Sequence, residues 1–291
     1  MDETARYSRP MHSGASSRFL IGVASVLATA GLLAGCSGSD DEGGSGSDGG
    51  RPSSTVVASD ADVVLAVDGD DAVAHVDDRF QSYNIEMVEV TGGEFWKPYD
   101  SGPGKVTRPP IDLTSERLRN LARGLGPAYI RVSGSWANTT YFDPEGTSGG
   151  VKPEGFGGVL TGDQWKGVGD FARAVDGEVV TSFASGTGVR DAAGVWQPDQ
   201  ARSLLEFSKA NDVPVVAAEL VNEPSIPLGV PAGYDAAAFG RDFTTFKEMV
   251  DDVMPDLRIV GPGAVEDVTP IILKGPAIPA EDMFKAADGD Y

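Results

Sequence analysis

The segment VPVVAAELVNEPS, Val213 to Ser225, decides between the fold classes that the sequence allows. Its first nine residues are predominantly apolar, which is typical of a strand in a parallel sheet that helices cover on both faces. The run ends in Asn222-Glu223-Pro224, and proline ends a strand because it has no N–H to donate. Two carboxylates, Glu219 and Glu223, therefore lie at the carboxyl end of a segment that otherwise has the composition of a core strand.

Strands and helices are predicted to alternate on both sides of this segment. Apolar runs rich in β-branched residues indicate strands, and apolar residues at helical spacing with capping residues indicate helices between most of them. Alternation of this kind predicts βαβ units around a parallel sheet. The strands are expected at 82–90, 128–134, 178–186, 213–222 and 257–264, and the helices at 114–125, 161–175, 198–211 and 234–253.

Two parallel architectures fit this alternation, a doubly wound sheet and a barrel. The usual dinucleotide and phosphate signatures, G-x-G-x-x-G after the first strand and G-x-x-x-x-G-K-[ST], are absent. Polar residues gather instead at the carboxyl ends of the strands, where a (β/α)₈ barrel keeps its active site: Ser133, Ser185, Asn222-Glu223 and Glu266. The sequence favours an α/β fold of the (β/α)₈ TIM barrel type, with only about the first five β/α units present.

The first 55 residues predict an export signal and a tether. Three arginines precede an apolar run at 19–35, the order found in a secretory signal and short for a membrane span. The run ends in LAGC, which is similar to a bacterial lipobox that would place a lipid on Cys36. A plain signal peptide or membrane anchor is the alternative. Residues 1–36 are therefore assigned as a lipoprotein signal, and the Gly/Ser/Asp-rich residues 37–55 as a disordered tether.

Composition restricts the possible chemistry. The chain has 23 Lys and Arg against 44 Asp and Glu, and its net charge of −21 argues against nucleic acid as a partner. Cys36 is the single cysteine, so no intrachain disulfide forms, and the two histidines lie far apart. No metal site and no cofactor are predicted. Catalysis would depend on carboxylates, amides, hydroxyls and aromatic rings.

The position of Glu223 suits a proton donor. A carboxyl at the mouth of an apolar barrel is partly removed from water, which favours its protonated form, as a general acid for glycosidic cleavage requires. Residues two apart in a strand share a face, so Glu219 and Glu223 are expected to point the same way and Asn222 to point away. In the alternative interpretation Glu223 caps a loop and Glu219 pairs with a buried arginine.

Three segments carry a resemblance to a known family. ELVNEPS, Glu219 to Ser225, resembles the fourth-strand motif of the glycosidase superfamily with (β/α)₈ barrels, in which Asn-Glu carries the acid/base. LARGLGPAYIRVSGSWANTTYFDP, Leu121 to Pro144, and RIVGPGAV, Arg258 to Val265, are similar in the same order to the heparanase-like enzymes, glycoside hydrolase family 79. The resemblance covers roughly residues 82–270.

The resemblance implies roles for individual residues. Glu223 would be the general acid/base, and Asn222 would contact the sugar. Asn138 stands where heparanase has an aspartate near the substrate, and Ser133 replaces a glycine of the same strand-end motif, so heparan specificity and the pocket floor can differ. Further candidates for substrate binding are Glu86 in the first strand and the aromatic residues Trp96 and Trp136, with a core or rim position as the alternative for each. Arg131 and Arg190 could meet a uronate carboxylate, although the sequence does not place either in the site.

The resemblance also implies that the site is incomplete. Retaining glycosidases use two carboxyls about 5–5.5 Å apart, and the family's nucleophile is a glutamate on the seventh barrel strand. The glutamates after Glu223 are Glu248, Glu266 and Glu281, and none follows a seventh strand. The chain is therefore expected to be truncated and inactive alone, with residues 81–291 forming the first part of a catalytic barrel. Residues 56–80, with a hairpin at 63–76, are expected to belong to an accessory β-sandwich.

The predicted function is that of an exported glycoside hydrolase with a retaining mechanism that cleaves β-linked glucuronides or related glycans. Its partners would be the glycan and the membrane, through Cys36, and its location the cell surface, periplasm or extracellular space. One alternative is another glycosidase of the superfamily that acts on neutral glycans. The other is a non-catalytic lipoprotein of the cell surface that binds glycan.

Overall fold

The computed structural model describes residues 75–98, 101–226, 229–265 and 278–287. The chain divides into two units, Met1–Val67 and Asp68–Tyr291, and all described residues belong to the second. The predicted signal, Cys36, the tether and nearly all of the predicted hairpin lie outside the described residues. Residues 75–81 contain a turn in which Phe80 N–H donates to the Asp77 carbonyl over 3.2 Å.

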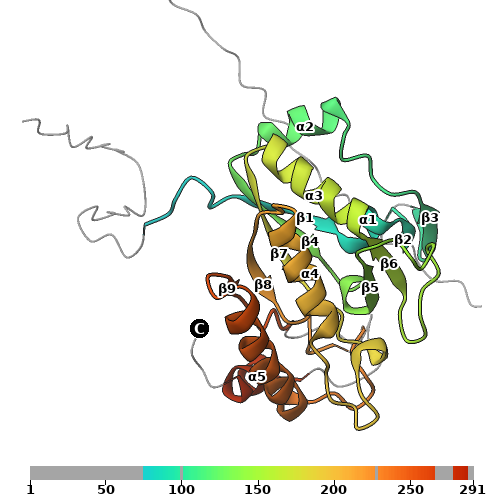
Figure 1. Cartoon of the computed structure of the whole chain (residues 1–291), viewed down its shortest axis with the longest axis vertical. Helices are drawn as coiled ribbons and strands as arrows, with labels where there is room; N and C mark the ends of the chain where they lie inside the picture. The colour runs from blue at the N-terminus through green and yellow to red at the C-terminus, as the bar shows by residue number, and fades with distance from the viewer. Residues whose placement is uncertain (1–74, 99–100, 227–228, 266–277, 288–291) are drawn as a thin grey trace, which may run out of the picture. The chain divides into compact units, whose positions relative to one another are not determined.

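The centre of the described unit is a parallel sheet of five strands, as the sequence predicts (Figure 1). The strands are β1 (Ser82–Glu86), β4 (Ala128–Ser133), β7 (Gly177–Ser182), β8 (Val215–Glu219) and β9 (Arg258–Ile259). They pair in the order in which they occur in the chain, so every crossover adds the next strand on the same side. A doubly wound sheet would instead reverse its order at a switch point. The α/β prediction is confirmed, and closure into a barrel remains a prediction.

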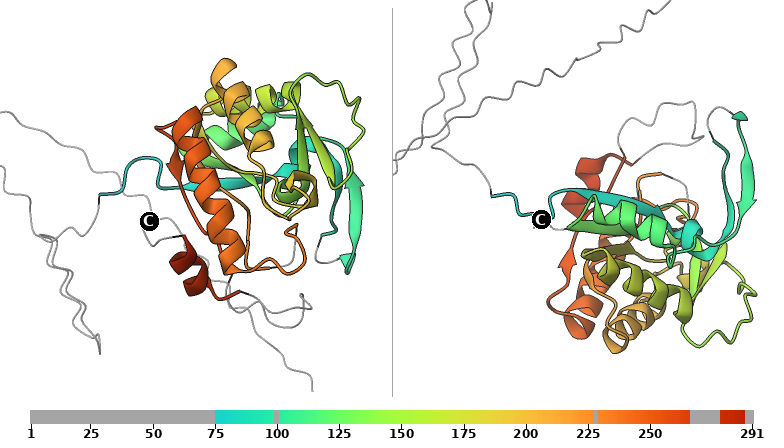
Figure 2. Two further views of the ribbon diagram at one scale, coloured as in Figure 1. Left: turned by 60° about the horizontal axis from the view of Figure 1, so that its bottom comes forward. Right: turned by 90° about the horizontal axis from the view of Figure 1, so that it is seen from above.

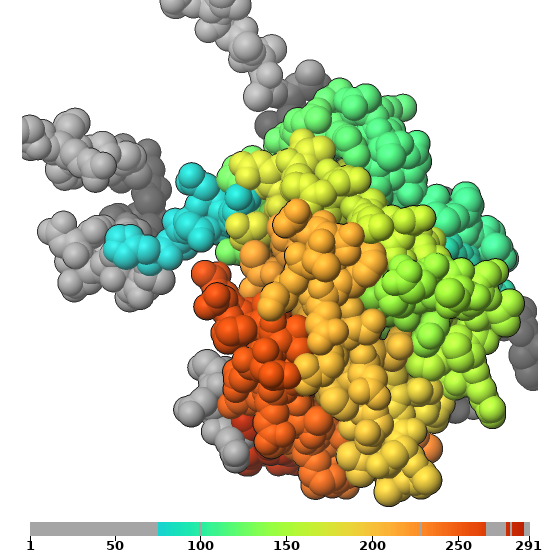
Figure 3. Space-filling model, in the orientation of Figure 1, coloured from blue at the N-terminus to red at the C-terminus, as the bar shows by residue number. Residues whose placement is uncertain are grey.

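The four predicted helices are present within two residues of the expected bounds at each end. They are α2 (Glu116–Arg123), α3 (Gly162–Ala174), α4 (Asp199–Ala210) and α5 (Ala236–Val253). Capping explains where α3 and α5 begin: Thr161 and Gln164 form a capping box, and the Asp235 carboxylate accepts the Ala238 N–H over 2.8 Å. In Figure 1, α3 and α4 lie in front of the strands, and Figure 3 shows α4 and α5 forming one continuous surface on this side.

Several short elements were not predicted. The first strand ends at Glu86 rather than at residue 90, because the Glu86 N–H donates to the Glu89 carboxylate over 3.0 Å and starts a helix. Glu281 lies in a helix rather than in a loop, since Pro279 at the N-cap leads into its first turn. The additional elements are α1 (Met87–Thr91), β2 (Gly93–Trp96), β3 (Lys105–Arg108), β5 (Thr140–Asp143), β6 (Gly158–Thr161), α6 (Ala280–Ala286) and the 3₁₀ turns Ala137–Thr139 and Thr187–Val189.

Strand β9 is shorter than predicted, and helix α2 buries less of its apolar stripe than predicted. Strand β9 is only two residues long, because Gly261, at a φ of 114°, and Pro262 end the extended backbone. On α2 the predicted apolar stripe is only partly buried: the helix buries Ala122, while Leu121 is 64% exposed.

Large aromatic side chains from the helices and from the segment before α4 fill the core. Trp165, Trp196 and Phe246 are each no more than 1% exposed. The indole N–H groups of both tryptophans are satisfied, Trp165 by the Ser208 hydroxyl at 2.8 Å and Trp196 by the Ala184 carbonyl at 2.9 Å. Burying a side chain of this kind stabilises a fold by about 1.5–3 kcal/mol. This packing supports the sheet whose carboxyl edge carries the candidate site.

Candidate active site

A row of polar side chains crosses the sheet at the carboxyl ends of its strands. Glu86 is the register partner of Ser133, and Ser182 that of Glu219. The hydroxyls of Ser133 and Ser182 lie 2.6 Å apart, and Ser133 Oγ donates to Glu219 Oε1 over 3.0 Å. Four neighbouring strands therefore contribute one polar residue each to the same face, and two of these residues are carboxylates.

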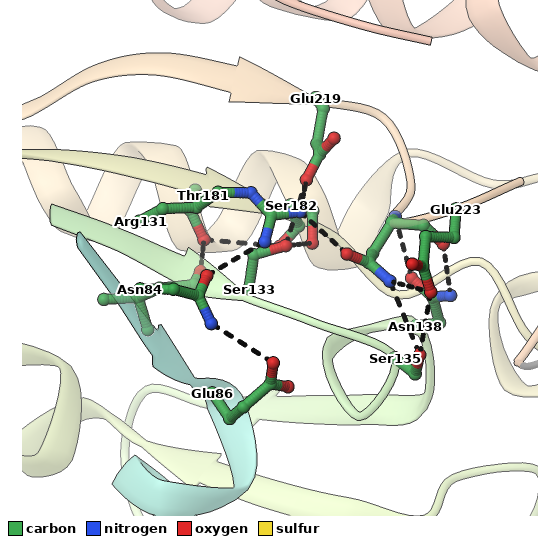
Figure 4. Close-up of polar contacts among 12 residues, drawn as sticks. Asn84, Glu86, Arg131, Ser133, Ser135, Asn138, Thr181, Ser182, Glu219 and Glu223 are labelled. Atoms are coloured by element: carbon green, nitrogen blue, oxygen red, sulfur yellow. Dashed lines mark hydrogen bonds and ion pairs between the residues drawn. The ribbon is translucent and has the colours of Figure 1, made fainter. Parts of the chain in front are cut away.

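Arg131 connects this row to the residue before Glu223 (Figure 4). It lies two positions before Ser133 on β4 and therefore on the same face. Its Nη1 donates to Asn84 Oδ1 over 2.9 Å, and its Nη2 donates both to Glu219 Oε1 and, over 2.7 Å, to Asn222 Oδ1. Because arginine carries only donors, the oxygen of the Asn222 amide must face the guanidinium and its nitrogen must face the other way.

The carboxylate of Glu223 receives that amide nitrogen. Asn222 Nδ2 donates to Glu223 Oε2 over 3.2 Å, and the Ser135 hydroxyl lies 3.4 Å from the same oxygen. The Glu223 side chain is half-buried. Its backbone has a φ of 49°, a left-handed conformation that is uncommon for residues other than glycine. Strain of this kind persists where the surrounding contacts enforce it, and it is found preferentially at functional sites.

The predicted directions of Asn222 and Glu223 need correction. Strand β8 ends at Glu219, and Glu223 lies in the turn that follows, so strand alternation does not apply to it. Asn222 does not point away from the carboxylates but joins Arg131 to Glu223. For Glu219, the alternative interpretation is confirmed, since it forms an ion pair with the partly buried Arg131.

Glu86 is the third carboxyl on this face. Its Oε1 accepts from Asn84 Nδ2 over 3.1 Å, whereas Oε2 is buried and has no hydrogen-bond partner among the described residues. The carboxyl occupies the space beside Gly134, where an added Cβ would overlap with Oε2. Gly134 also has a φ of 93°, so both its backbone and its lack of a side chain are required here.

The carboxyl groups of Glu86 and Glu219 are both easier to protonate than in water. Burial is the main cause that raises the pKa of each, and it outweighs the opposing effect of the Arg131 charge. The negative charge of Glu223 raises both pKa values further. Glu86 and Glu219 thus lie near one guanidinium, and burial still favours the protonated form of each.

Asn138, a predicted substrate contact, holds the backbone of Asn222. Its Nδ2 donates to the Asn222 carbonyl over 2.8 Å, and its Oδ1 accepts the Asn222 N–H over 3.0 Å. Asn138 is fully buried, with the backbone of Gly229, at a φ of 82°, packed against it. Ser133 is equally buried. Contact of Asn138 or Ser133 with a substrate remains a prediction. In the structure, Asn138 holds the backbone that follows β8, and Ser133 joins the ends of β4, β7 and β8.

Trp136 stands beside these residues and is half-buried. Its ring contacts Phe95 and Trp96, with centroids 5.2 Å and 5.6 Å apart. The second arginine considered for a uronate lies in another environment: Arg190 pairs with Asp242 over 2.8 Å, and its side chain is only 4% exposed.

The sequence interpretation missed the contributions of Ser135 and Asn84 and could not place Arg131. The sequence did contain a signal for two of them. Asn84 lies two residues before Glu86 on one strand and Arg131 lies two residues before Ser133 on the next, so each shares a face with a candidate residue. Among the described residues, no group of three or more His, Cys, Asp or Glu could hold a metal ion. No helix in that part of the chain has both the length and the apolar character needed to cross a membrane.

The family model described as "Glycosyl hydrolase family 79, N-terminal domain" matches residues 62–265. The chain belongs to glycosyl hydrolase family 79. The matched segment of this family 79 chain contains all five strands of the parallel sheet, the Arg131 network and Glu223. The resemblance that the three sequence segments carry is therefore confirmed.

Solved structures similar to the family 79 chain include three glycosidases. A 4-O-α-L-rhamnosyl-β-D-glucuronidase from Fusarium oxysporum 12S is 18% identical over 47% of this chain and 30% of that one, with a TM-score of 0.31. An endo-β-1,4-mannanase from Thermotoga petrophila is 15% identical over 66% and 44%, with a TM-score of 0.37. The endo-1,4-β-D-mannanase of Thermotoga petrophila RKU-1 is 16% identical over 73% and 66%, with a TM-score of 0.38.

All three TM-scores are below 0.5, so the assignment rests on the family model. The chain spans less than two thirds of the length of each of these structures. No curated protein matches the sequence.

Proposed function

We propose that Glu223 is the general acid/base of a retaining glycoside hydrolase. The observation that supports this most directly is the position of its carboxylate: beyond the carboxyl end of β8, on a left-handed residue, and within reach of Asn222 Nδ2 and the Ser135 hydroxyl. Membership of family 79 and the singly wound order of the strands support a site at this edge of a (β/α)₈ barrel.

In this mechanism the protonated Glu223 gives its proton to the glycosidic oxygen as the bond to the leaving sugar breaks. The resulting carboxylate then takes a proton from the water that releases the sugar from its covalent intermediate. Asn222 would orient the carboxyl and contact the sugar next to it, with its own amide set by Arg131. The nucleophile must be a second carboxyl. Glu219 is unsuited to that role because it is only 5% exposed and lies within β8, beneath the turn that carries Glu223.

We propose β-linked glucuronides or related glycans as substrates. The resemblance of Leu121–Pro144 to heparanase-like enzymes supports this choice. Within it, Asn138 in place of an aspartate and Ser133 in place of a glycine favour a pocket that differs from that of heparanase itself. Glu86 would contribute its carboxyl to the same pocket, since it lies at the end of β1 in register with Ser133.

We further propose that the protein is exported and anchored to the membrane by a lipid on Cys36. The charged-then-apolar order of residues 1–35 and the sequence LAGC support this. Replacing Cys36 with serine would then release the protein from the membrane fraction, as measured by fractionation and immunoblotting. Continued membrane association of that variant would contradict the anchor.

The substrate proposal is tested with a panel of aryl β-glycosides, offered to the protein expressed from its full reading frame. Turnover of the β-glucuronide, with much weaker turnover of the β-glucoside and β-mannoside, is the expected result. Preference for a neutral glycoside would instead support a glycosidase acting on neutral glycans. Glycan binding without turnover, unchanged in Glu223→Gln, would support a non-catalytic lipoprotein.

A further inference from the structure

The hairpin formed by β2 and β3 presents aromatic and basic side chains next to the candidate active site. The antiparallel register places Trp96 opposite Lys105 and Gly93 opposite Arg108. Figure 2 shows this hairpin at the edge of the described unit, away from helices α4 and α5. We refer to Phe95, Trp96, Lys105, Arg108 and the neighbouring Trp136 as the hairpin platform.

The aromatic rings of the hairpin platform form one cluster. Trp136 contacts Trp96 edge-on, with centroids 5.6 Å apart and planes at 76°, and it contacts Phe95 at 5.2 Å. Trp96 remains 51% exposed despite this contact. Trp96 thus keeps an exposed ring surface next to the candidate site, backed by two partly buried rings. Its flat apolar face suits the C–H face of a sugar ring.

Two cations lie over these rings. Lys105 Nζ is 5.1 Å from the centroid of Trp96 and 5.5 Å from that of Trp136, and the Arg108 guanidinium is 5.3 Å from that of Phe95. Within the residues that the structure describes, neither cation forms an ion pair with a carboxylate. Glu94 is the acidic residue of β2, and its register partner is Thr107 rather than a cation. In a chain with a net charge of −21, this local positive charge is distinctive.

The hairpin platform continues the candidate site. Trp136 directly follows Ser135, whose hydroxyl lies 3.4 Å from Glu223 Oε2. The Trp136 carbonyl accepts from Thr140 Oγ1 over 2.8 Å, which anchors the backbone that carries both residues. A glycan with one bond at Glu223 would therefore extend over Trp136 toward Trp96.

We propose that the hairpin platform is a second sugar-binding subsite, specific for an acidic residue of the glycan chain. The sugar ring stacks on Trp96, and its carboxylate or sulfate group pairs with Lys105 and Arg108. This inference rests on the proposed function, because the glycan reaches the hairpin platform only if one of its glycosidic bonds is held at Glu223. It adds that the preferred ligand is an acidic oligosaccharide rather than a single glycoside.

The test is isothermal titration calorimetry of the full chain with two tetrasaccharides of equal length. One is a hyaluronan tetrasaccharide, which alternates glucuronate with N-acetylglucosamine, and the other is neutral chitotetraose. Trp96→Ala and Lys105→Ala should each weaken hyaluronan tetrasaccharide binding on the order of tenfold, because the first removes the stacking surface for the sugar ring and the second removes one cation for its carboxylate. The matched control is Lys166→Ala, because Lys166 also lies over an aromatic ring, Phe207 at 5.4 Å, but on helix α3.

The expected result is hyaluronan binding that falls with added salt, is reduced in both hairpin variants and is unchanged in Lys166→Ala. Equal affinity for chitotetraose, unchanged affinity in the hairpin variants, or no binding of the acidic tetrasaccharide would each overturn the subsite. This outcome is separate from that of the proposed function. If Glu223 is not the acid/base, Glu223→Ala keeps its turnover of a small aryl glucuronide while the difference in tetrasaccharide binding remains. If the platform is wrong, the hairpin variants bind the hyaluronan tetrasaccharide normally while turnover of the aryl glucuronide still depends on Glu223.

Discussion

The guanidinium of Arg131 donates a hydrogen bond to the side-chain oxygen of Asn222 over 2.7 Å. This contact joins the middle of the sheet to the turn that carries the candidate acid/base. The contact turns the amide nitrogen of Asn222 toward Glu223. The donor, Arg131 Nη2, also pairs with Glu219. The orientation of the candidate catalytic carboxyl thus depends on the ion pair between Arg131 and Glu219.

Removing the arginine should destabilise the protein markedly. Arg131→Met would leave Glu219, whose side chain is 7% exposed, without its cation, and breaking a buried pair in this way costs about 3–5 kcal/mol. The free energy of unfolding, measured by urea denaturation, should fall by an amount at the lower end of that range because Arg131 is partly exposed. The double variant Arg131→Met/Glu219→Leu should recover a large part of the loss. Strictly additive losses would contradict the buried-charge explanation.

Glu86→Gln should make stability less dependent on pH. Burial raises the pKa of Glu86 in the folded state, so the folded state binds a proton more readily than the unfolded state does. The cost of ionising this group is therefore absent in acid and appears as the pH rises through the folded-state pKa. We expect Glu86→Gln to match the unsubstituted protein at pH 4 and to exceed it at pH 7, on the order of 1 kcal/mol or less.

Thermal or urea unfolding at several pH values measures this difference. The surface variant Glu248→Gln, on the exposed side of α5, controls for the general effect of removing one negative charge. An advantage of Glu86→Gln that is the same at pH 4 and pH 7 would show that the burial of this carboxyl is not its cause.

Gly134→Ala should displace the Glu86 carboxyl. The added Cβ would overlap with Glu86 Oε2, and the φ of 93° is unfavourable for any residue with a side chain. We expect a loss of about 2 kcal/mol or more in the free energy of unfolding. Gly149→Ala is the matched control, because Gly149 has a φ of 60° but no atom within 4 Å of an added Cβ. If the two alanine variants lose equal stability, the clash with Glu86 contributes nothing.

The left-handed backbone conformation of Glu223 should lower the free energy of unfolding of the protein. Its φ of 49° suits glycine better than any residue with a Cβ, so Glu223→Gly is expected to be more stable than Glu223→Ala by about 1 kcal/mol. Both variants remove the carboxylate, so the comparison isolates the backbone conformation. Differential scanning calorimetry of the two proteins measures it. A less stable glycine variant would contradict the left-handed turn.

The sequence predicts much of the sheet because its strands are apolar runs between capped helices. Glu223 could be proposed as a candidate site residue because the Asn-Glu-Pro motif is a short continuous segment that follows a core strand. Helix α1 was not predicted because Met87, Val88 and Val90 suit a strand equally well, and the capping contact between Glu86 and Glu89 is not visible as an apolar pattern. The hairpin of β2 and β3 was not predicted because its strands are only four residues long and mostly exposed.

The polar network could not be predicted, because it depends on register between distant strands. Arg131 and Glu219 are 88 residues apart in the sequence, and their contact requires the exact alignment of β4, β7 and β8. The direction of Asn222 depends on where β8 ends, and a shift of one residue reverses an alternation argument. The sequence thus identifies the candidate acid/base, and the structure identifies what holds it.

The most direct test of the account is the leaving-group dependence of Glu223→Ala, in the protein expressed from its full reading frame. Values of kcat/KM are measured for an alkyl β-glucuronide and for its 2,4-dinitrophenyl counterpart, and kcat on the activated substrate is measured with and without azide, with Glu248→Gln as the control. If Glu223 is the acid/base, kcat/KM falls about 10²–10⁴-fold for the alkyl substrate and far less for the activated one, and azide raises kcat on the activated substrate by releasing the sugar as the glucuronyl azide. Equal losses on both substrates without azide rescue, or full activity in Glu223→Ala, would contradict the assignment.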